Sequence, residues 1–263
     1  MSDDQPIGVG RTAEVYPVGE RMVVKVLLPG FDSRSLEIEA RKTQAAHDAG
    51  VKAPGTHGAH ALGGRVGYLF DRIDGQVMLD VLRSRPWAYR AHASLLARLH
   101  AEMHGRRTAR LPSVKDLLAA KIDAAVPLDE ATRRFAKDRL LALDDDDAVL
   151  HGDYHPGNVM VSSGGPVVID WLDAARGAPA ADVARSLWLM SPAGIPAGTP
   201  QRAVLVRFLA LFRRRYLRTY RSATALDSEA LNAWRVPVLA GRLSEGIGHE
   251  VGPVLAELAR LVR

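Results

Sequence analysis

Three polar residues carry the clearest chemical signal in the sequence. Asp153 and Asn158 lie five positions apart in the stretch HGDYHPGN (residues 151–158), and Asp170 ends an apolar run 17 positions after Asp153. A strand, a turn and a second strand between Asn158 and Asp170 would return both side chains to one edge. Mg²⁺ binds oxygen ligands and takes one or two of them from protein beside phosphates and waters. The pattern therefore predicts a site for Mg²⁺ and a phosphate compound.

The loop 151–158 and the tripeptide IDW (residues 169–171) together resemble the aminoglycoside phosphotransferase and choline kinase family, the small-molecule branch of the protein-kinase-like fold. Protein kinases share the Asp-to-Asn spacing and the downstream metal-binding Asp. The resemblance runs from the N-terminal glycines to about Arg185. It implies that Asp153 orients the acceptor hydroxyl and takes its proton, while Asn158 and Asp170 hold Mg²⁺ against phosphate oxygens.

Three further residues are expected to hold this loop in shape. In the family, histidines such as His151 and His155 chiefly brace the loop, and direct catalysis by either is the alternative. The segment GAPAAD (residues 177–182) resembles the family's Gly-x-Pro-x-x-Asp segment. The resemblance implies that Asp182 anchors the loop from the start of a helix.

A glycine-containing turn near the N-terminus is a candidate phosphate loop. Gly8 and Gly10 lie where a strand turns, and backbone without side chains can approach phosphates closely. The third glycine of the kinase loop is replaced by Ala13, so the motif is weaker than the one downstream. Arg11 at its tip is either a phosphate contact or a solvated arginine.

Lys25 is a single charge within the apolar run MVVKVL (residues 22–27). A buried ammonium group needs a carboxylate or phosphate partner. A following helix offers Glu37 and Glu39, which point about 200° apart. Because positions 37, 41, 44 and 48 are all polar, Glu39 is expected to face inward and pair with Lys25, with a surface pair as the alternative. The resemblance makes Lys25 the lysine that holds the α- and β-phosphates.

The segment YLFDRIDG (residues 68–75) resembles the family's hinge between lobes. The resemblance implies that main-chain groups near Asp71 and Ile73 bind the adenine edge. Phe70 either lines the base pocket or belongs to the core. Because backbone does this work, side chains do not distinguish ATP from GTP.

The order of elements predicts an α+β fold. Strands dominate the first 75 residues (9–18, 21–28, 54–62 and 65–73), with one helix from about residue 32 to Gly50. Helical patterns fill 76–143 and the chain after 179, around an island with short strands at 158–161 and 167–169. The resemblance implies a protein-kinase-like two-lobe fold. Residues 1–75 would form a nucleotide-binding lobe with an antiparallel sheet, and 76–263 a mainly helical lobe carrying loop 151–158 and Asp170.

Composition narrows the classes further. The 263 residues include no cysteine, which rules out disulfides, thiolate metal sites and a cysteine nucleophile. Neither a signal peptide nor an apolar run of roughly 18 residues is evident, so we expect a cytoplasmic protein without a membrane partner. The net charge of +5 comes from residues 195–263, where seven arginines at 202–221 alternate with apolar residues at helical spacing. A packed helix with a solvated basic face is favoured over a nucleic-acid surface, because no aromatic stacking motif accompanies it.

The resemblance implies a Mg·ATP-dependent kinase that transfers the γ-phosphate to a hydroxyl of a small molecule. The acceptor is an aminoglycoside-like antibiotic or a hydroxylated metabolite. The alternatives are a protein Ser/Thr kinase, against which the sequence lacks the DFG and APE motifs, and a catalytically silent nucleotide-binding scaffold. If the 202–221 arginines face the cleft, they favour a neutral or anionic acceptor. If they face solvent, Asp173, Glu245 and Glu250 are candidates for an acidic acceptor site.

Overall fold

A β-hairpin lies at the centre of the N-terminal lobe. β2 (Ala13–Val18) and β3 (Met22–Leu27) pair antiparallel around Gly19, whose φ of 62° is a conformation that glycine adopts without a steric penalty. The sheet has the order β1-β2-β3-β5-β4 and is completed by β1 (Gly8–Val9), β4 (Thr56–Leu62) and β5 (Arg65–Asp71). The predicted strand 9–18 is interrupted, because the amide of Gly10 turns back to the carbonyl of Ala13.

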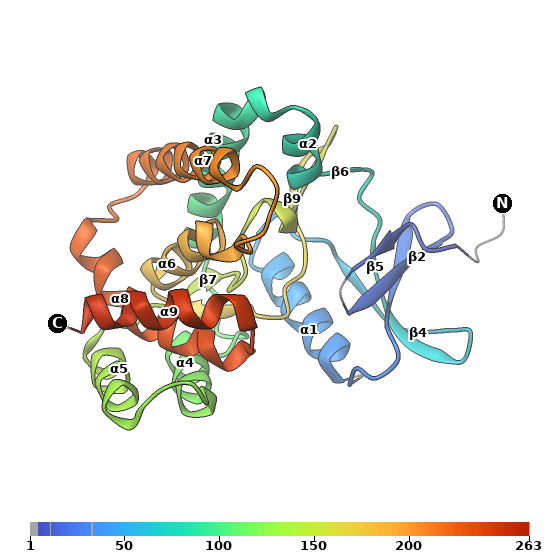
Figure 1. Cartoon of the computed structure of the whole chain (residues 1–263). Coiled ribbons are helices and arrows are strands. Elements are labelled where there is room, and N and C mark those ends of the chain that lie inside the picture. Colours follow the sequence, from blue (N-terminus) through green and yellow to red (C-terminus); the bar gives the residue numbers. More distant parts are fainter. Residues whose placement is uncertain (1–4, 11, 33, 263) are drawn as a thin grey trace.

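The computed structural model describes residues 5–10, 12–32 and 34–262, which form two lobes (Figure 1). The fold is α+β and protein-kinase-like, as the sequence predicts. Helix α1 (Arg34–Asp48) lies on the side of the sheet that faces the helical lobe. It buries Leu36, Ala40 and Ala46 and ends before Gly50, which has a φ of 80°.

Two small sheets of the C-terminal lobe frame the loop 151–158. β6 (Gly75–Val77) pairs with β8 (Val159–Ser162), which pairs with β9 (Gly165–Val168). β7 (Ala148–Leu150) pairs with β10 (Ala175–Gly177). The sequence patterns miss β6, β7 and β10, because a strand of three residues is too short for alternation to be recognised. β6 also needs a glycine: a Cβ at Gly75 would lie 2.6 Å from the carbonyl oxygen of Val161.

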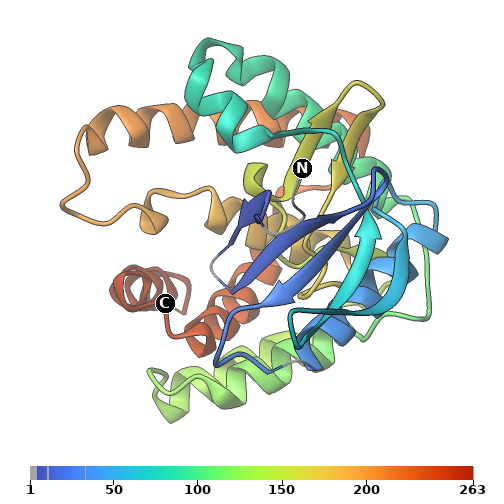
Figure 2. The same ribbon diagram turned by 90° about the vertical axis from the view of Figure 1, so that its right-hand side faces the viewer.

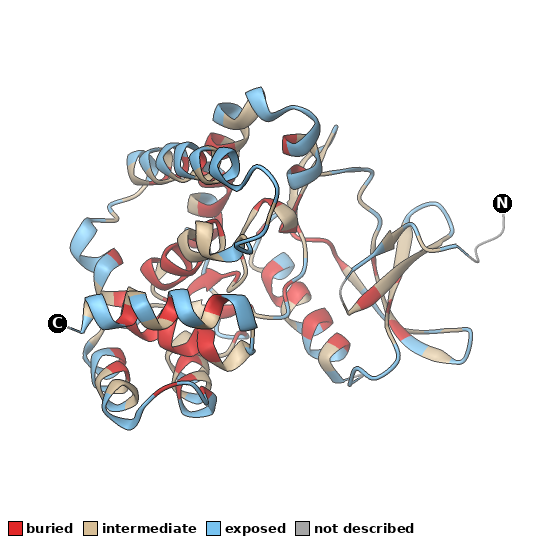
Figure 3. Cartoon of the chain, viewed as in Figure 1, coloured by how far each residue is buried: buried red, intermediate tan, exposed pale blue. Residues whose placement is uncertain are grey.

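Helices make up the rest of the C-terminal lobe, and their buried residues face one another (Figure 3). Short 3-10 turns occupy Pro86–Ala88, Pro156–Asn158, Pro192–Gly194 and Leu243–Glu245. Among the described residues, none of the helices is both long and apolar enough to cross a membrane. The helices are α2 (Met78–Ser84), α3 (Tyr89–His104), α4 (Val114–Ala124), α5 (Glu130–Ala142), α6 (Pro179–Leu189), α7 (Arg202–Ala223), α8 (Ser228–Arg242) and α9 (Gly248–Leu261).

Helix α7 is the arginine-rich segment, and it packs along α3 in both views (Figures 1 and 2). Its residues Phe212, Tyr216 and Tyr220 are buried, which matches the helical spacing seen in the sequence. Five of its seven arginines are exposed: Arg202, Arg207, Arg214, Arg215 and Arg218. The helix is therefore a packed helix with a basic outer face, as the sequence predicts.

Candidate active site

Lys25 lies between the two lobes and contacts both. Its Nζ is 2.7 Å and 2.8 Å from the two carboxylate oxygens of Glu39 on α1, and 3.5 Å from Oδ1 of Asp170. Glu39 is buried and is the inward-facing glutamate that the helical spacing predicts. Burial lowers the pKa of Lys25, but the attraction of Glu39 and Asp170 outweighs it and leaves the pKa above its usual value. Lys25 is therefore charged at the junction of the lobes.

Asp170 has an unusual backbone conformation. Its φ is 66°, in the left-handed region that aspartate visits more readily than most residues. Ile169 separates the residue from the end of β9, and the Ile169 amide donates to the carbonyl of Asn158 at 2.9 Å. The Asp170 side chain is half exposed, and its carboxylate faces the ammonium group of Lys25. Backbone strain of this kind occurs often at functional sites.

Asp153 and Asn158 face each other within the loop. The side-chain amide of Asn158 donates to the carbonyl oxygen of Asp153 at 2.9 Å and to its Oδ2 at 3.1 Å. Asn158 is buried, whereas Asp153 is partly open to solvent. Because Nδ2 is used by Asp153, the amide oxygen of Asn158 is the atom left for a ligand.

Histidines brace the loop, as expected. His151 bonds the carbonyl of Ile169 through Nε2 at 2.9 Å and accepts the amide of Asp153 through Nδ1 at 3.2 Å. His155 accepts the amide of Gly157 at 2.9 Å, which leaves its Nε2 3.6 Å from Oδ2 of Asp153. The first histidine ties the loop to the strand before Asp170, and the second places an N–H beside Asp153.

Asp182 anchors the loop from below, in the first turn of α6. Its carboxylate accepts the amides of His151 at 2.6 Å and Gly152 at 3.0 Å. It also accepts Nε2 of His100 at 3.1 Å and of His104 at 3.3 Å, both from α3. Burial raises the pKa of Asp182, but the contacts with the two histidines together outweigh burial, so the pKa lies well below its usual value. The anchoring role was predicted, but the two histidines were not.

The buried group His100, His104 and Asp182 has the residue types of a metal site. Each histidine Nδ1, however, lies 2.6 Å from a tyrosine hydroxyl of α7, Tyr216 or Tyr220, and each Nε2 is bonded to Asp182. Burial, followed by the charge of His104, lowers the pKa of His100 to about 3. Both ring nitrogens of each histidine are thus hydrogen-bonded, one to Asp182 and one to a tyrosine hydroxyl, so the cluster acts as a support beneath the loop.

Arg185, one turn after Asp182 on α6, is a contact that sequence reasoning missed. Its Nε donates to the carbonyl of Gly152, and its Nη2 is 3.6 Å from Oδ1 of Asp153. Burial raises the pKa of Asp153. The hydrogen bond of His155 and the charge of Arg185 lower it by more than burial raises it, so the pKa lies well below the usual range. Asp153 is therefore a carboxylate at neutral pH, ready to accept a hydrogen bond from a hydroxyl.

The acidic residues considered for an acceptor site are all paired with cations. Asp173 Oδ1 lies 2.9 Å from Lys121, and Glu245 Oε1 lies 2.8 Å from Arg185. Glu250 is held by two hydrogen bonds from Arg242, which also contacts Glu245. The site is therefore a network of alternating charges rather than a free acidic patch.

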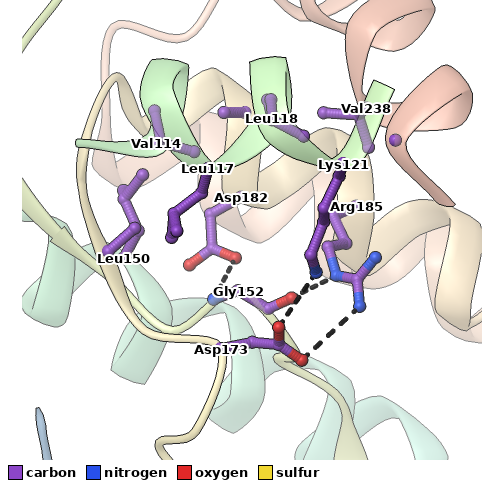
Figure 4. A pocket seen from close by; sticks show the side chains of 13 residues that line it. Val114, Leu117, Leu118, Lys121, Leu150, Gly152, Asp173, Asp182, Arg185 and Val238 are labelled. Carbon is purple, nitrogen blue, oxygen red and sulfur yellow. Dashed lines mark hydrogen bonds and ion pairs between the residues drawn. The ribbon is translucent and has the colours of Figure 1, made fainter. Parts of the chain in front are cut away.

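A hollow beside the loop is partly built from this network (Figure 4). Lys121, Asp173 and Arg185 lie at one side and join through ion pairs, and Gly152 forms part of the wall. The opposite wall is apolar and comes from α4, β7 and α8. It contains Val114, Leu117, Leu118, Leu150 and Val238.

The glycines predicted to contact phosphates lie in and beside the first strand of the N-terminal sheet. Gly8 pairs with Val15 in the sheet, and Gly10 forms the turn to Ala13. Arg11 lies outside the described residues. Both glycines lie before β2, which pairs with β3, the strand that carries Lys25.

The hinge residues are partly used by the N-terminal lobe itself. Phe70 is buried. The Asp71 side chain accepts the amide of Gly55 at 2.7 Å and pairs with His57 at 2.8 Å, and the Asp71 amide donates to the Gly55 carbonyl. Among the described residues, the amide of Ile73 has no hydrogen-bond acceptor, so it is available to bind a ligand.

A divalent cation fits the donors at the end of this loop. Asp170 offers a half-exposed carboxylate, and Asn158 offers an amide oxygen with its nitrogen already used. One carboxylate and one neutral oxygen are the hard ligands that Mg²⁺ takes when phosphates and waters complete its shell. The sequence has no cysteine that could bind a softer metal here.

A sheet lobe with a Lys–Glu ion pair, joined to a helical lobe with an Asp–Asn loop, defines a protein-kinase-like phosphotransferase fold. Residues 3–234 match the family model of the phosphotransferase enzyme family, APH. Because that match covers most of the chain, the protein belongs to this family. Among curated proteins, none matches the chain significantly.

Solved structures share the fold at low sequence identity. A thermostable mutant of the aminoglycoside phosphotransferase APH(4)-Ia aligns with a TM-score of 0.61 and 18% identity, covering 100% of this chain and 94% of that one. A choline/ethanolamine kinase family protein from Mesorhizobium loti gives 0.61 and 15%, covering 98% and 87%. The amicoumacin kinase hAmiN, in complex with AMP-PNP, Ca²⁺ and Ami, gives 0.61 and 15%, covering 97% and 85%. The expected fold and family are thus confirmed.

Proposed function

We propose that this protein is a Mg·ATP-dependent kinase that transfers the γ-phosphate of ATP to a hydroxyl of a small molecule. The observation that carries the proposal is the position of Lys25, whose ammonium group bridges Glu39 at 2.7 Å and Asp170 at 3.5 Å across 145 positions of sequence. A charged lysine fixed beside an exposed carboxylate is the arrangement that neutralises phosphates and holds a metal ion.

The roles follow from the chemistry of phosphoryl transfer, in which positioning and charge neutralisation dominate. Lys25 binds the α- and β-phosphates, and Glu39 orients it. Asn158 and Asp170 hold Mg²⁺, which supplies charge neutralisation at the phosphates. The backbone at Gly8 and Gly10 lies over the phosphates, and the hinge at Phe70, Asp71 and Ile73 holds the base.

Asp153 orients the acceptor. Its ionised carboxylate accepts the hydrogen bond of the attacking hydroxyl and takes the proton late, when the new oxygen–phosphorus bond forms. Asn158 keeps one carboxylate oxygen turned inward, and Arg185 holds the other from the opposite side. A carboxylate with a depressed pKa suffices here, because a loose transition state needs little base strength before the bond to phosphorus has formed.

The two lobes on either side of the hinge have different roles in this proposal. We propose residues 1–75 as the nucleotide lobe and 76–263 as the lobe that carries the catalytic loop and the acceptor site. The pairing of β6 with β8 supports this boundary, because the chain enters the second lobe's sheet at Gly75.

The short segment after Asp170 argues against a protein substrate. β10 begins at Ala175 and α6 at Pro179, so no chain length is available for a loop that would bind a polypeptide. Lys25, Glu39, Asp153, Asn158 and Asp170 are all present, which argues against a silent scaffold, since a scaffold needs no acceptor carboxylate.

Nucleotide-induced thermal stabilisation tests the proposal. We expect ATP to raise the melting temperature of the wild type, and to raise it more with Mg²⁺, because a ligand that binds only the folded state stabilises it. In Asp170→Asn the Mg²⁺-dependent increment should disappear while the metal-independent part persists. Asp80→Asn, an exposed acid on α2, is the matched control. Equal Mg²⁺ increments in wild type and Asp170→Asn would refute the metal-binding role.

A further inference from the structure

The charges beside Asp153 restrict the kind of acceptor that the site can take. Resting on the proposed kinase function, we propose that the acceptor is an uncharged hydroxyl compound, and that Lys121 excludes polycations from the site. The site would therefore discriminate against aminoglycosides, which carry several ammonium groups.

The first step of the argument is charge balance. Asp173 and Glu245 are the acids next to Asp153, and Lys121 bonds both, at 2.9 Å and 3.3 Å. Arg185 contacts the same two acids, at 3.8 Å and 2.8 Å. Neither carboxylate is left without a cation, so an incoming ammonium group would have to displace Lys121 or Arg185.

A third cation reaches the network from the other lobe. Lys42 of α1 donates to the carbonyl of Leu172 at 2.7 Å, next to Asp173. Burial lowers the pKa of Lys42 and the nearby Lys121 lowers it further, while the attraction of Asp173 opposes both. Three basic groups thus balance the three acids Asp153, Asp173 and Glu245, and an acceptor ammonium would add a fourth cation.

An anionic acceptor is also disfavoured, because the same network contains carboxylates. Asp153 is ionised and must lie within hydrogen-bond distance of the reacting hydroxyl. A negative group beside that hydroxyl would meet the carboxylates of Asp153 and Asp173. Because both signs of charge are already balanced, an uncharged acceptor loses least on entering the site.

Binding of a polycation probe tests the role of Lys121 without knowledge of the acceptor. We would measure the Kd of neomycin by calorimetry at low salt, with wild type, Lys121→Met and Lys121→Gln. Removing the ammonium group of Lys121 should leave Asp173 and Glu245 with one cation fewer. The Kd of neomycin should then fall by about tenfold, which corresponds to roughly 1.4 kcal/mol. Methionine keeps the apolar stem of the lysine packed on α4, and glutamine provides a second variant if methionine misfolds.

A matched control carries the same charge change elsewhere. Lys137 on α5 is paired with Asp123 at 2.8 Å and is exposed, so Lys137→Met should leave the neomycin Kd unchanged. An equal gain in Lys137→Met would show that net charge alone is responsible. Neomycin binding to the wild type as tight as to Lys121→Met would overturn the proposal.

An acceptor screen read by ADP release tests the substrate class directly. Neutral alcohols and sugars should give a higher kcat/KM than choline-like amines, hydroxy acids and aminoglycosides. An aminoglycoside with the highest kcat/KM would overturn the inference while leaving the kinase function intact. Loss of Mg·ATP stabilisation would instead refute the kinase function itself. If no compound in the screen is turned over, the neomycin measurement decides.

Discussion

The guanidinium group of Arg185 lies 3.6 Å from the carboxylate of Asp153, and its Nε donates to the carbonyl of the preceding Gly152. One side chain of α6 therefore holds both the backbone and the functional group of the loop. The opposite end of the guanidinium is fixed by Glu245 at 2.8 Å, in the turn before α9. The orientation of Asp153 thus depends on the packing of the C-terminal helices.

This relationship predicts that Arg185 acts on activity through Asp153. Arg185→Gln should lower kcat by about 10–100-fold, because small misplacements of a catalytic group cost that much. Without the guanidinium charge, the pKa of Asp153 should rise toward its usual value, while the hydrogen bond of His155 still lowers it. Since the ionised form is active, the acid limb of the pH profile of kcat/KM should move to higher pH. Arg185→Lys should restore part of that shift, and an unshifted acid limb in Arg185→Gln would contradict the role.

Asp153 itself should be required for turnover but not for nucleotide binding. Asp153→Asn keeps an oxygen that can accept from Asn158 but removes the charge and the proton acceptor, so we expect kcat to fall by about 10²–10⁴-fold. Thermal stabilisation by Mg·ATP should stay as in wild type. ADP release under saturating ATP measures the first effect, and undiminished turnover would refute the assignment.

The Lys25–Glu39 ion pair should matter mainly for ATP. Glu39→Gln removes the carboxylate that holds Lys25 at 2.7 Å, so the ammonium group moves toward Asp170 and away from the phosphates. We expect KM for ATP to rise by about tenfold, equivalent to about 1.4 kcal/mol of lost binding. Glu37→Gln, two positions away on the exposed face of α1, is the matched control and should behave as wild type. Equal KM values in the two variants would argue against the pair.

Much of the site was predictable because its members obey local rules. Lys25 stands out as one charge in an apolar strand, and the helical period distinguishes Glu39 from Glu37. The Asp153–Asn158–Asp170 spacing needs only one short hairpin to bring its ends together, and β8 and β9 supply it.

The remainder depends on packing that no local pattern encodes. Lys121, Asp173, Arg185 and Glu245 come from different elements and meet only after α4, α6 and the turn before α9 have assembled. Charged residues this far apart in sequence show no periodic pattern. The sequence therefore left an unpaired acidic site at Asp173 and Glu245 as one alternative. Likewise, nothing in the residues near Asp182 indicates that two histidines of α3 will donate to it.

The histidine support beneath the loop should make stability depend on pH. His100 has a pKa of about 3 in the folded protein because burial disfavours its charge, and about 6.5 when unfolded. The unfolded state then binds more protons between these values, so the stability that neutral His100 contributes is present above pH 6.5 and is lost as pH falls. Between pH 7 and pH 5 this should amount to about 2 kcal/mol of unfolding free energy. In His100→Gln, where an amide can still donate to Asp182 and accept from Tyr216, that part of the slope should vanish. Urea unfolding at a series of pH values measures it, with His60→Gln in β4 as the control; identical slopes in wild type and His100→Gln would show that the imidazole is not the group that titrates.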